Sequence, residues 1–437
     1  GSSENDLFRN DILNNTNEGV LLRQNSGNNT VSQNTVERNG GPGIELDSSD
    51  DNGVKDNGEV RRNDEGVVLD GSNENDLLRN DILNNTNEGV LLRQNSDNNS
   101  VEDNDANENG RDGIVVDSSS GNLLKNNDAK ENGGDGYVLT AGSEENEVKF
   151  NDAKENEKNG VLVRGSDENE VEFNTLLLNE VHGMLLRNSE DSVVGANAAS
   201  ANRKDGIRLN SSGGSVLSLN AGTGNRDGIA LVDSNGGRLS GNNVSENGRN
   251  GLYLESSSSN NIVNTTAFNN SRWDFRSVGT AGVGEIFFLR TETANVTIEG
   301  SNSTELGMKS VKSPPSPPSN QSPTDIYINA TAAKADSYLD LSVHYTAETV
   351  SDIDESTVAV WEHEPATDNW TELESTVDIP NNTVRSNITE FSEFGVFGEE
   401  ETQLFTEALV DSFDGPPTNT GELNATLYED LSGDGDG

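Results

Sequence analysis

Apolar and polar positions alternate in short runs along the first 276 residues, and the runs return at a fixed interval. A glycine followed by an apolar residue, a variable residue and a second apolar residue recurs every 22 to 24 residues. Two further apolar segments of three to five residues lie in each interval, separated by Asn, Gly and Ser. Segments this short are typical of β-strands. The glycines are Gly19, Gly43, Gly66, Gly89, Gly113, Gly136, Gly160, Gly183, Gly206, Gly228 and Gly251.

Asparagines recur with the same period at two places in the repeat. Stacked coils would set these side-chain amides above one another, where each can donate and accept a hydrogen bond. Asn and Gly also tolerate the left-handed backbone that sharp corners need. The two columns are Asn10, Asn34, Asn57, Asn80, Asn104, Asn127, Asn151, Asn174, Asn197, Asn220 and Asn242, and Asn15, Asn39, Asn85, Asn109, Asn132, Asn156, Asn179, Asn202, Asn225 and Asn247.

The repeat predicts an all-β chain built on a parallel β-helix, with about 12 coils of about 23 residues and three faces per coil. A leucine-rich repeat is the competing solenoid, but the chain has too little Leu and too much Gly, Ser and Asn for it. Residues 71–96 nearly copy residues 1–26, which fits growth of the scaffold by whole coils.

The pattern changes after residue 276, and we divide the chain accordingly. We expect the β-helix over 1–276, cap strands over 277–312, a Pro-rich linker over 313–323, a small β-sandwich over 324–398 and an acidic tail over 399–437. The sandwich is predicted from short alternating strands with turn residues between them.

Charge is the strongest compositional feature, with 77 acidic and 29 basic residues and a formal net charge of −48. Because concentrated salt screens such charge, the composition indicates a haloarchaeal type of protein. It shows no basic patch and so disfavours nucleic acid as a partner. Cysteine is absent, which excludes disulfides and thiolate metal sites. Many Asn-x-Ser/Thr sequons suit an exported glycoprotein.

The repeats take the form N-x-V-x-x-N-x-A-x-x-N-G-x-x-G-I-x-V. Over about residues 1–276 they resemble the right-handed parallel β-helix superfamily that includes NosD-like and pectin-lyase-like proteins. The NosD resemblance implies copper, which prefers His, Cys and Met. The chain has three His, two Met and no Cys. Met184, near His182, holds an inward position and is interpreted as core packing.

Carboxylates on an outward face are the best candidates for catalysis, since sugar hydrolysis needs a pair of them. Glu45 and Asp47 should point outward from one coil, and Asp70 should align with Asp47 on the next. Arg23 and Arg93 flank them. Chance alignment of outward acids is the simpler interpretation in so acidic a chain.

An outward apolar stripe is the second candidate, because the variable residue of the Gly motif should face away from the core. Its apolar excess indicates that the C-terminal sandwich or a partner covers this face, although strand propensity alone gives the same residues. The stripe comprises Leu21, Val68, Leu91, Val115, Val138, Leu162 and Leu185.

The last eight residues match half of a calcium-binding loop. Asp430, Ser432 and Asp434 hold oxygen-ligand positions, Asp436 follows, and Gly435 supplies the turn. The segment resembles the opening of a dockerin-like module and implies Ca²⁺, but the acid that would complete the loop is missing.

Taken together, we expect an extracellular or cell-surface β-helical scaffold in a halophile that acts in carbohydrate binding, adhesion or envelope structure. Surface glycans and self-association are the expected partners. The alternative is a polysaccharide lyase or glycoside hydrolase acting on acidic or surface glycans. The sequence predicts no membrane span, and because it starts within a repeat we interpret it as a fragment.

Overall fold

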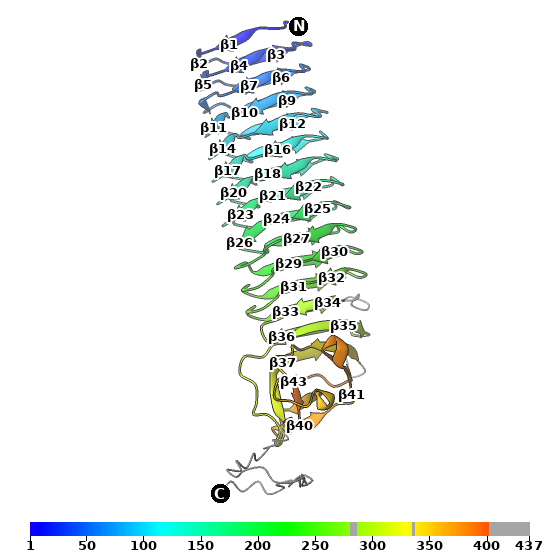
Figure 1. The fold of residues 1–437 in the computed structure, drawn as a ribbon. Helices are drawn as coiled ribbons and strands as arrows, with labels where there is room; N and C mark the ends of the chain where they lie inside the picture. Colours follow the sequence, from blue (N-terminus) through cyan, green and yellow to red (C-terminus); the bar gives the residue numbers. More distant parts are fainter. Residues whose placement is uncertain (280–285, 334–336, 402–437) are drawn as a thin grey trace, which may run out of the picture. The chain divides into compact units, whose positions relative to one another are not determined.

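The computed structural model describes residues 1–279, 286–333 and 337–401. As the period predicts, the chain is all-β, and its first part is a parallel β-solenoid of stacked coils (Figure 1). Most coils contribute one short strand to each of three parallel sheets, and residues aligned between coils lie 22 to 24 positions apart in the sequence. About twelve coils of about 23 residues are present, so the predicted fold class is confirmed.

The three sheets of the solenoid are named here by the order in which the chain first enters them. Sheet 1 contains β1 (Asp6–Phe8), β4 (Thr30–Ser32), β7 (Gly53–Lys55), β10 (Asp76–Leu78), β13 (Ser100–Glu102), β16 (Leu123–Lys125), β19 (Glu147–Lys149), β22 (Glu170–Glu172), β25 (Val193–Gly195), β28 (Val216–Ser218), β30 (Arg238–Ser240) and β32 (Asn261–Val263).

Sheet 2 contains β2 (Asp11–Leu13), β5 (Thr35–Glu37), β8 (Glu59–Arg61), β11 (Asp81–Leu83), β14 (Asp105–Asn107), β17 (Asp128–Lys130), β20 (Asp152–Lys154), β23 (Thr175–Leu177) and β26 (Ala198–Ser200). Sheet 3 carries the Gly motif and contains β3 (Val20–Arg23), β6 (Ile44–Asp47), β9 (Val67–Asp70), β12 (Val90–Arg93), β15 (Ile114–Asp117), β18 (Tyr137–Thr140), β21 (Val161–Arg164), β24 (Met184–Arg187), β27 (Ile207–Asn210), β29 (Asp227–Val232), β31 (Asn250–Glu255) and β33 (Trp273–Val278).

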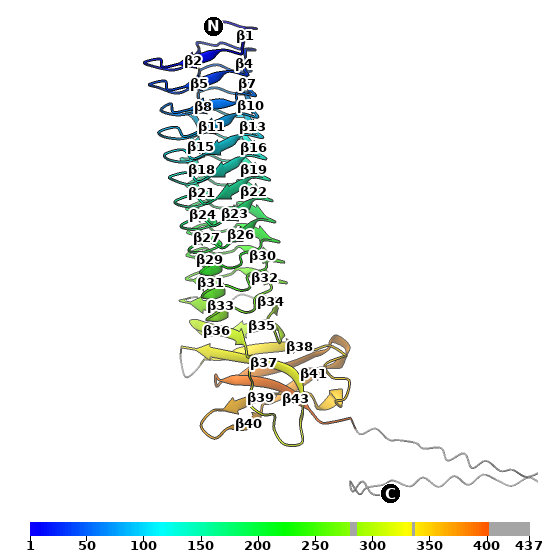
Figure 2. The same ribbon diagram turned by 90° about the vertical axis from the view of Figure 1, so that its left-hand side faces the viewer.

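Antiparallel strands continue two of these sheets at the end of the solenoid (Figures 1 and 2). Sheet 1 passes through β34 (Ile286–Arg290), β35 (Asn295–Ser301), β38 (Leu339–His344), β42 (Thr383–Ile388) and β41 (Ser375–Asp378). Sheet 3 passes through β36 (Glu305–Ser310), β37 (Ser322–Ala332), β43 (Glu393–Gly398), β39 (Ala359–Glu364) and β40 (Asn369–Glu372). Two short 3-10 helices, η1 (Glu355–Thr357) and η2 (Ile379–Asn381), lie between the strands.

The expected cap strands and the expected sandwich are therefore joined by continuous backbone pairing. Segment 311–321, which includes most of the Pro-rich stretch, contains no strand, whereas Pro323 lies within β37. One hydrophobic core runs from Val20 to Val396 through both parts.

Ladders of buried Asn side chains hold the corners of the coils together. In one coil the Asn127 Oδ1 accepts from the backbone N–H of Asn104 at 2.9 Å and from its Nδ2 at 3.0 Å. The Asn127 Nδ2 donates to the Val101 carbonyl at 2.8 Å and to the Asn151 Oδ1 at 3.1 Å. Each amide thus satisfies backbone and side-chain groups that the corner would otherwise bury unpaired.

Two further ladders have the same period but were not part of the sequence prediction. A third Asn column links Asn75, Asn99 and Asn122 through Nδ2-to-Oδ1 bonds of 3.1 and 3.2 Å. A serine column joins the backbone N–H of Ser96 to the Ser119 Oγ at 3.0 Å. All three Asn columns and the Ser column therefore work as stacked hydrogen-bonding corners.

Core packing explains the one Tyr at an inward position of sheet 3. Tyr137 is fully buried where most other coils have Val, Ile or Leu. Ala129 and Ala153 line the facing inner column of sheet 2 and leave room for the ring. The Tyr137 hydroxyl donates to the Asn127 carbonyl at 2.6 Å, which satisfies the one polar group the ring brings into the core.

We predict that Asn127→Ala lowers the free energy of unfolding by about 3 kcal/mol, because it leaves several buried partners in two coils without a hydrogen bond. Asn17→Ala is the matched control, since the Asn17 side chain is exposed, and should stay within about 0.5 kcal/mol of the wild type. Denaturant unfolding of the two variants measures both. Equal losses would show that the ladder does not carry this stability.

Candidate functional sites on the outer face of sheet 3

The predicted carboxylate cluster forms in part. The Arg93 guanidinium lies 2.8 Å from Asp70 and 3.9 Å from Glu45, and so joins the two acids. Asp47 pairs in register with Asp70, but its carboxylate accepts from the Ser48 hydroxyl at 2.9 Å. Burial, followed by the nearby Glu18 and Asp70 carboxylates, raises the pKa of Glu45, although Arg93 opposes the shift. The cluster is an ion-paired surface group that reaches across three coils.

The predicted apolar stripe lies on this face, but the chain itself buries much of it. Val68, Val115 and Val138 are only 1%, 7% and 5% exposed. Leu91, Leu162 and Leu185 are half-buried, and Leu21 at the N-terminal end is 37% exposed. The antiparallel strands continue the solenoid at its end and do not lie over these positions (Figure 2). Solvent therefore reaches little of the apolar stripe in the middle of the face.

Beyond the stripe, the turns that lead into sheet 3 carry a column of cations. Lys204, Arg226, Arg249 and Arg272 stand two residues before the glycine position of four consecutive coils, one above the other. Strand spacing places neighbouring members about 4.8 Å apart along the solenoid axis. We name these four residues the cationic ladder. The composition shows no basic patch, but the fold assembles one from positions 22 or 23 residues apart.

Two buried acids lie under the middle of the cationic ladder. Asp205 and Asp227 are 0% and 1% exposed. Arg226 bridges them, with its Nη2 2.9 Å from Asp205 and its Nε 3.2 Å from Asp227. Burial, followed by the Asp205 carboxylate, raises the pKa of Asp227. The pairing satisfies the acids and fixes the Arg226 side chain.

The ends of the cationic ladder are not neutralised in this way. Among the described residues, no carboxylate lies within 4 Å of the Lys204 ammonium or the Arg272 guanidinium, and both side chains are exposed. Cations stacked this closely repel one another. Because Lys204 and Arg272 are exposed and unpaired with a carboxylate among the described residues, their positive charge faces solvent. The net charge of the chain as a whole is −48.

Aromatic rings and further arginines lie beside the cationic ladder. Tyr253 is half-buried beneath Arg249, whose guanidinium carbon is 5.5 Å from the ring centroid. Trp273 is likewise half-buried, with the guanidinium of Arg276 5.9 Å from its ring. That guanidinium also pairs with Glu305 at 2.7 Å. The Tyr253 hydroxyl donates to Glu255 at 3.1 Å. The resulting surface combines cations with planar apolar rings.

His182 belongs to the hydrogen-bonded column below the cationic ladder. Its Nδ1 accepts from the Asp205 backbone N–H at 3.1 Å, so this nitrogen carries no proton. Burial, followed by Arg208, Lys204 and Arg226, lowers the pKa of His182 to about 3. The imidazole is therefore neutral near pH 7 and acts as a corner acceptor, as Asn159 does one coil earlier.

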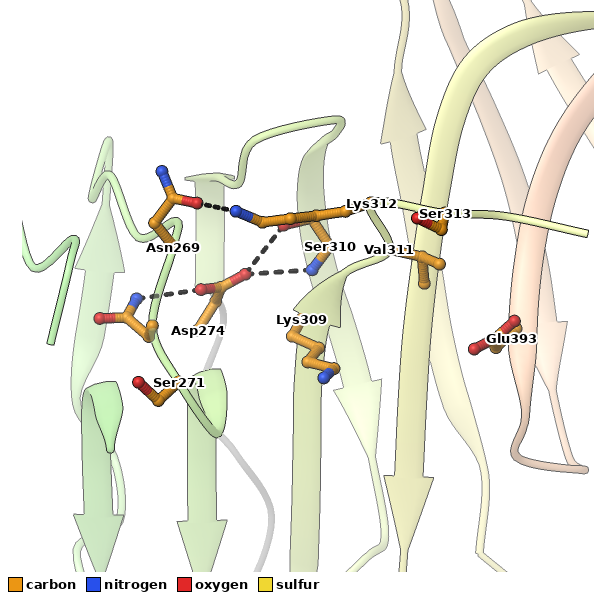
Figure 3. Close-up of a pocket in the computed structure, with 10 residues that line it drawn as sticks. Asn269, Ser271, Asp274, Lys309, Ser310, Val311, Lys312, Ser313 and Glu393 are labelled. Atoms are coloured by element: carbon orange, nitrogen blue, oxygen red, sulfur yellow. Dashed lines mark hydrogen bonds between the residues drawn. The ribbon is translucent and has the colours of Figure 1, made fainter. Parts of the chain in front are cut away.

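A hollow of about 450 Å³ lies where the last coil meets β36 and is lined by Asn269, Asn270, Ser271, Asp274, Lys309, Ser310, Val311, Lys312, Ser313 and Glu393 (Figure 3). On its wall, the Asp274 carboxylate accepts from the Asn270 Nδ2 at 2.9 Å, the Ser310 N–H at 3.0 Å and the Ser310 hydroxyl at 3.2 Å. Lys312 donates to the Asn269 Oδ1. Asp274 thus ends an Asn ladder and locks β36 onto the solenoid.

The partial calcium loop, Asp430, Ser432, Asp434 and Asp436, lies outside the described residues. Within the described ranges, no group of three or more His, Cys, Asp and Glu side chains could hold a metal ion. Among the described residues, no helix is long and apolar enough to cross a membrane.

Comparison with known families agrees with this architecture. The family described as right handed beta helix region matches residues 50–176 and 177–308. The family described as periplasmic copper-binding protein (NosD) matches residues 1–91. No curated protein matches the sequence.

Solved structures with a similar fold include the periplasmic alginate epimerase AlgG, at 17% identity over 50% of this chain, with a TM-score of 0.34. This chain covers only 55% of that protein. The Azotobacter vinelandii mannuronan C-5 epimerase AlgE4 A-module is 14% identical over 58% of this chain and 75% of its own, with a TM-score of 0.41. The Dettilon tailspike protein is 12% identical over 92% of this chain and 86% of its own, with a TM-score of 0.37.

Copper does not fit the residues that match the copper-binding family. Residues 1–91 contain no His, Cys or Met, which are the ligands that copper prefers. Met184 is fully buried in the core, as its inward position predicts, and the Nδ1 of His182 is occupied by a backbone N–H. Neither residues 1–91 nor the His182 and Met184 pair therefore offers the ligands of a copper site.

We predict that Asp274→Asn lowers stability by about 1–3 kcal/mol, because one acceptor oxygen facing Ser310 is lost. Burial raises the pKa of Asp274, so the folded protein holds this proton more tightly than the unfolded chain does. The wild type therefore gains stability from this group as pH falls through its pKa.

The variant lacks this gain. The difference in melting temperature between wild type and variant should widen between about pH 7 and about pH 4, as measured by thermal unfolding. A difference that is constant with pH would contradict the assignment.

Proposed function

Because the chain belongs to the right-handed β-helix family, in which the repeat itself is scaffold, we propose that its function lies in the side chains that depart from the repeat. Specifically, we propose that it binds acidic polysaccharide along the cationic ladder, at the cell surface or outside the cell. The observation that carries the proposal is the stack of Lys204, Arg226, Arg249 and Arg272 on four consecutive coils.

A regular row of cations suits a regular polyanion. Neighbouring members are about one strand spacing, about 4.8 Å, apart, which is comparable to the length of a sugar residue in a chain. Carboxylate or sulfate groups on successive sugars can then pair with successive coils. Arg binds such groups with two parallel hydrogen bonds, and several weak contacts on one polymer add to a strong one.

The rings beside the cationic ladder favour a sugar over a simple anion. Tyr253 and Trp273 present planar apolar surface next to Arg249 and Arg276. Such rings pack against the apolar face of a sugar while the cations hold its acidic group. The combination supports a uronate-containing or sulfated glycan as ligand.

The burial of the acids supports binding better than cleavage. Asp205 and Asp227, the carboxylates that pair with Arg226, are 0% and 1% exposed and cannot contact a bound sugar. The Glu45 and Asp70 group near the N-terminus is tied to Arg93. A polysaccharide lyase or glycoside hydrolase remains the second candidate, and the assay below includes it.

We predict that the full chain binds polygalacturonate and not neutral dextran, and that added salt weakens the binding by screening. Lys204→Gln with Arg272→Gln should reduce affinity about a hundredfold or more, since each lost charged contact is worth about 1.5–3 kcal/mol when well formed and about 1.4 kcal/mol is a factor of ten. Neither side chain has a carboxylate within 4 Å among the described residues, so the fold should be retained. Isothermal titration measures the affinity.

Arg9→Gln with Arg23→Gln is the charge-matched control, because it removes two exposed cations far from the cationic ladder, and it should bind as the wild type does. Equal losses in both double variants would show only an effect of net charge and would contradict the site. New reducing ends or unsaturated products in the same mixtures would favour the enzymatic alternative.

A further inference from the structure

A corner of the solenoid carries bulky apolar side chains in a position where most coils have polar ones. The residues that directly follow the strands of sheet 1 form one column in register, which we name the corner column. In the first six coils its members are Arg9, Gln33, Asp56, Arg79, Asp103 and Asn126. In the next five coils they are Phe150, Phe173, Ala196, Leu219 and Gly241.

These apolar members are exposed. Phe150, Phe173 and Leu219 are 51%, 49% and 70% exposed. The two Phe rings stack in parallel, with centroids 4.9 Å apart and planes 5° from parallel. Each of the three residues has a left-handed backbone, with φ of 59°, 57° and 57°. That conformation is unfavourable for bulky side chains and suits Asn or Gly, so local propensity does not account for them.

The surface next to Ala196 and Leu219 is uncharged, whereas Phe150 and Phe173 lie beside the ion-paired Lys149, Glu170 and Glu172. Residues 192–202 and 209–225 contain no Asp, Glu, Lys or Arg. They supply β25, β26 and β28, which lie on either side of the corner column at the levels of Ala196 and Leu219. A neutral stretch of this extent contrasts with a chain in which 24% of residues are charged. The corner column is thus apolar from Phe150 to Gly241, and it forms a neutral patch at the levels of Ala196 and Leu219 on an acidic molecule.

The corner column has the shape to pair with itself. Large and small members alternate from Phe173 through Ala196 and Leu219 to Gly241. The Leu219 side chain leans over Gly241, since its Cδ2 lies 2.9 Å from where a Gly241 Cβ would be. Leu219 therefore leans away from Ala196, whose small side chain lies between Phe173 and Leu219 in the column.

We propose that a second copy of this chain docks antiparallel on the corner column, about a two-fold axis between the coils of Ala196 and Leu219. This operation sets Leu219 of each copy against Ala196 of the other, and Phe173 of each beside the Leu219 side chain that leans over Gly241 in the other. Leu219 of each copy then meets the small Ala196 side chain of the other. A two-fold interface of this kind is closed and self-complementary.

The charge distribution indicates where two copies of this chain can make contact. Two chains of net charge −48 repel over most of their surface. The neutral patch is where they can approach most closely, and contact there removes exposed Phe and Leu surface from water. Salt at about 1 M shortens the screening length to about 3 Å, so the dimer should be most stable there.

The first test is the mass of the full chain by sedimentation velocity in about 1 M and about 0.15 M salt, at concentrations on the order of 10 µM. We expect a dimer in high salt that dissociates in low salt. Phe173→Asn with Leu219→Asn should be monomeric in both, with an unchanged or raised melting temperature, because Asn favours this corner. Gln33→Asn, in the same column near the N-terminus, should dimerise as the wild type does.

A wild type that is monomeric in high salt would overturn the proposal and assign the patch to another occupant, such as a glycan. A dimer that survives in the Asn double variant would overturn it as well. The Lys204→Gln, Arg272→Gln variant should still dimerise, so the outcome is independent of glycan binding.

The second test is the register, for which the absence of Cys in the chain gives a clean background. Full-length Ala196→Cys and Leu219→Cys chains, carrying tags of different mass, are mixed in high salt and oxidised with diamide. The two-fold arrangement predicts that the disulfide-linked heterodimer exceeds both linked homodimers. A parallel arrangement would link Ala196→Cys chains to one another and would contradict the proposed axis.

Discussion

The buried amide ladder is the interaction on which the rest of this structure depends. Each Asn in a column accepts from the coil before it and donates to the coil after it, as Asn104, Asn127 and Asn151 show. A corner can therefore be buried only if the next coil presents an amide at the same place. This requirement explains why the period is so strict and why insertions between columns are small. It also explains why the chain folds with so little apolar content, 30% of its residues.

The fold was predictable because every repeat carries the Asn residues and inward apolar residues that the stacked coils require. The Gly motif, two Asn columns and the inward Val, Ile and Leu positions were sufficient to place the strands of sheet 3. The third Asn column through Asn75 and Asn99 and the Ser column through Ser96 follow the same spacing and could have been found in the same way. The continuous pairing of β35 and β36 with the solenoid could not, because no repeat extends beyond the last coil.

The candidate sites were harder to predict, for two physical reasons. Alternation assigns Val115 and Val138 to the outer face, but it does not say that they are almost inaccessible to solvent there. The cationic ladder is built from residues of ordinary type at distant positions, and only the register aligns Lys204 with Arg226 and Arg249. A search directed at paired acids finds Glu45 and Asp70 and passes over the cations. The partial loop at Asp430 lies outside the described residues, and its calcium binding stays a prediction.

Different parts of each coil serve stability, the proposed glycan binding and the proposed dimer contact. The inner faces supply stability, the turns before sheet 3 carry the cationic ladder, and the corner after sheet 1 carries the exposed Phe and Leu residues. These two surfaces lie on different sides of the same coils, from Lys204 to Gly241. A dimer formed at the corner column would thus leave both cationic ladders open to a polyanion, which would raise the strength of binding through two attached sites.

The central claim is that acidic polysaccharide lies on the cationic ladder, and side-chain protection tests it most directly. The full chain is treated with phenylglyoxal in the presence and absence of polygalacturonate, and modification of each Arg is followed by mass spectrometry. The account predicts that the glycan protects Arg226, Arg249 and Arg272, whereas Arg9 and Arg23 react equally in both conditions. Equal protection of all five, or protection of none, would contradict it.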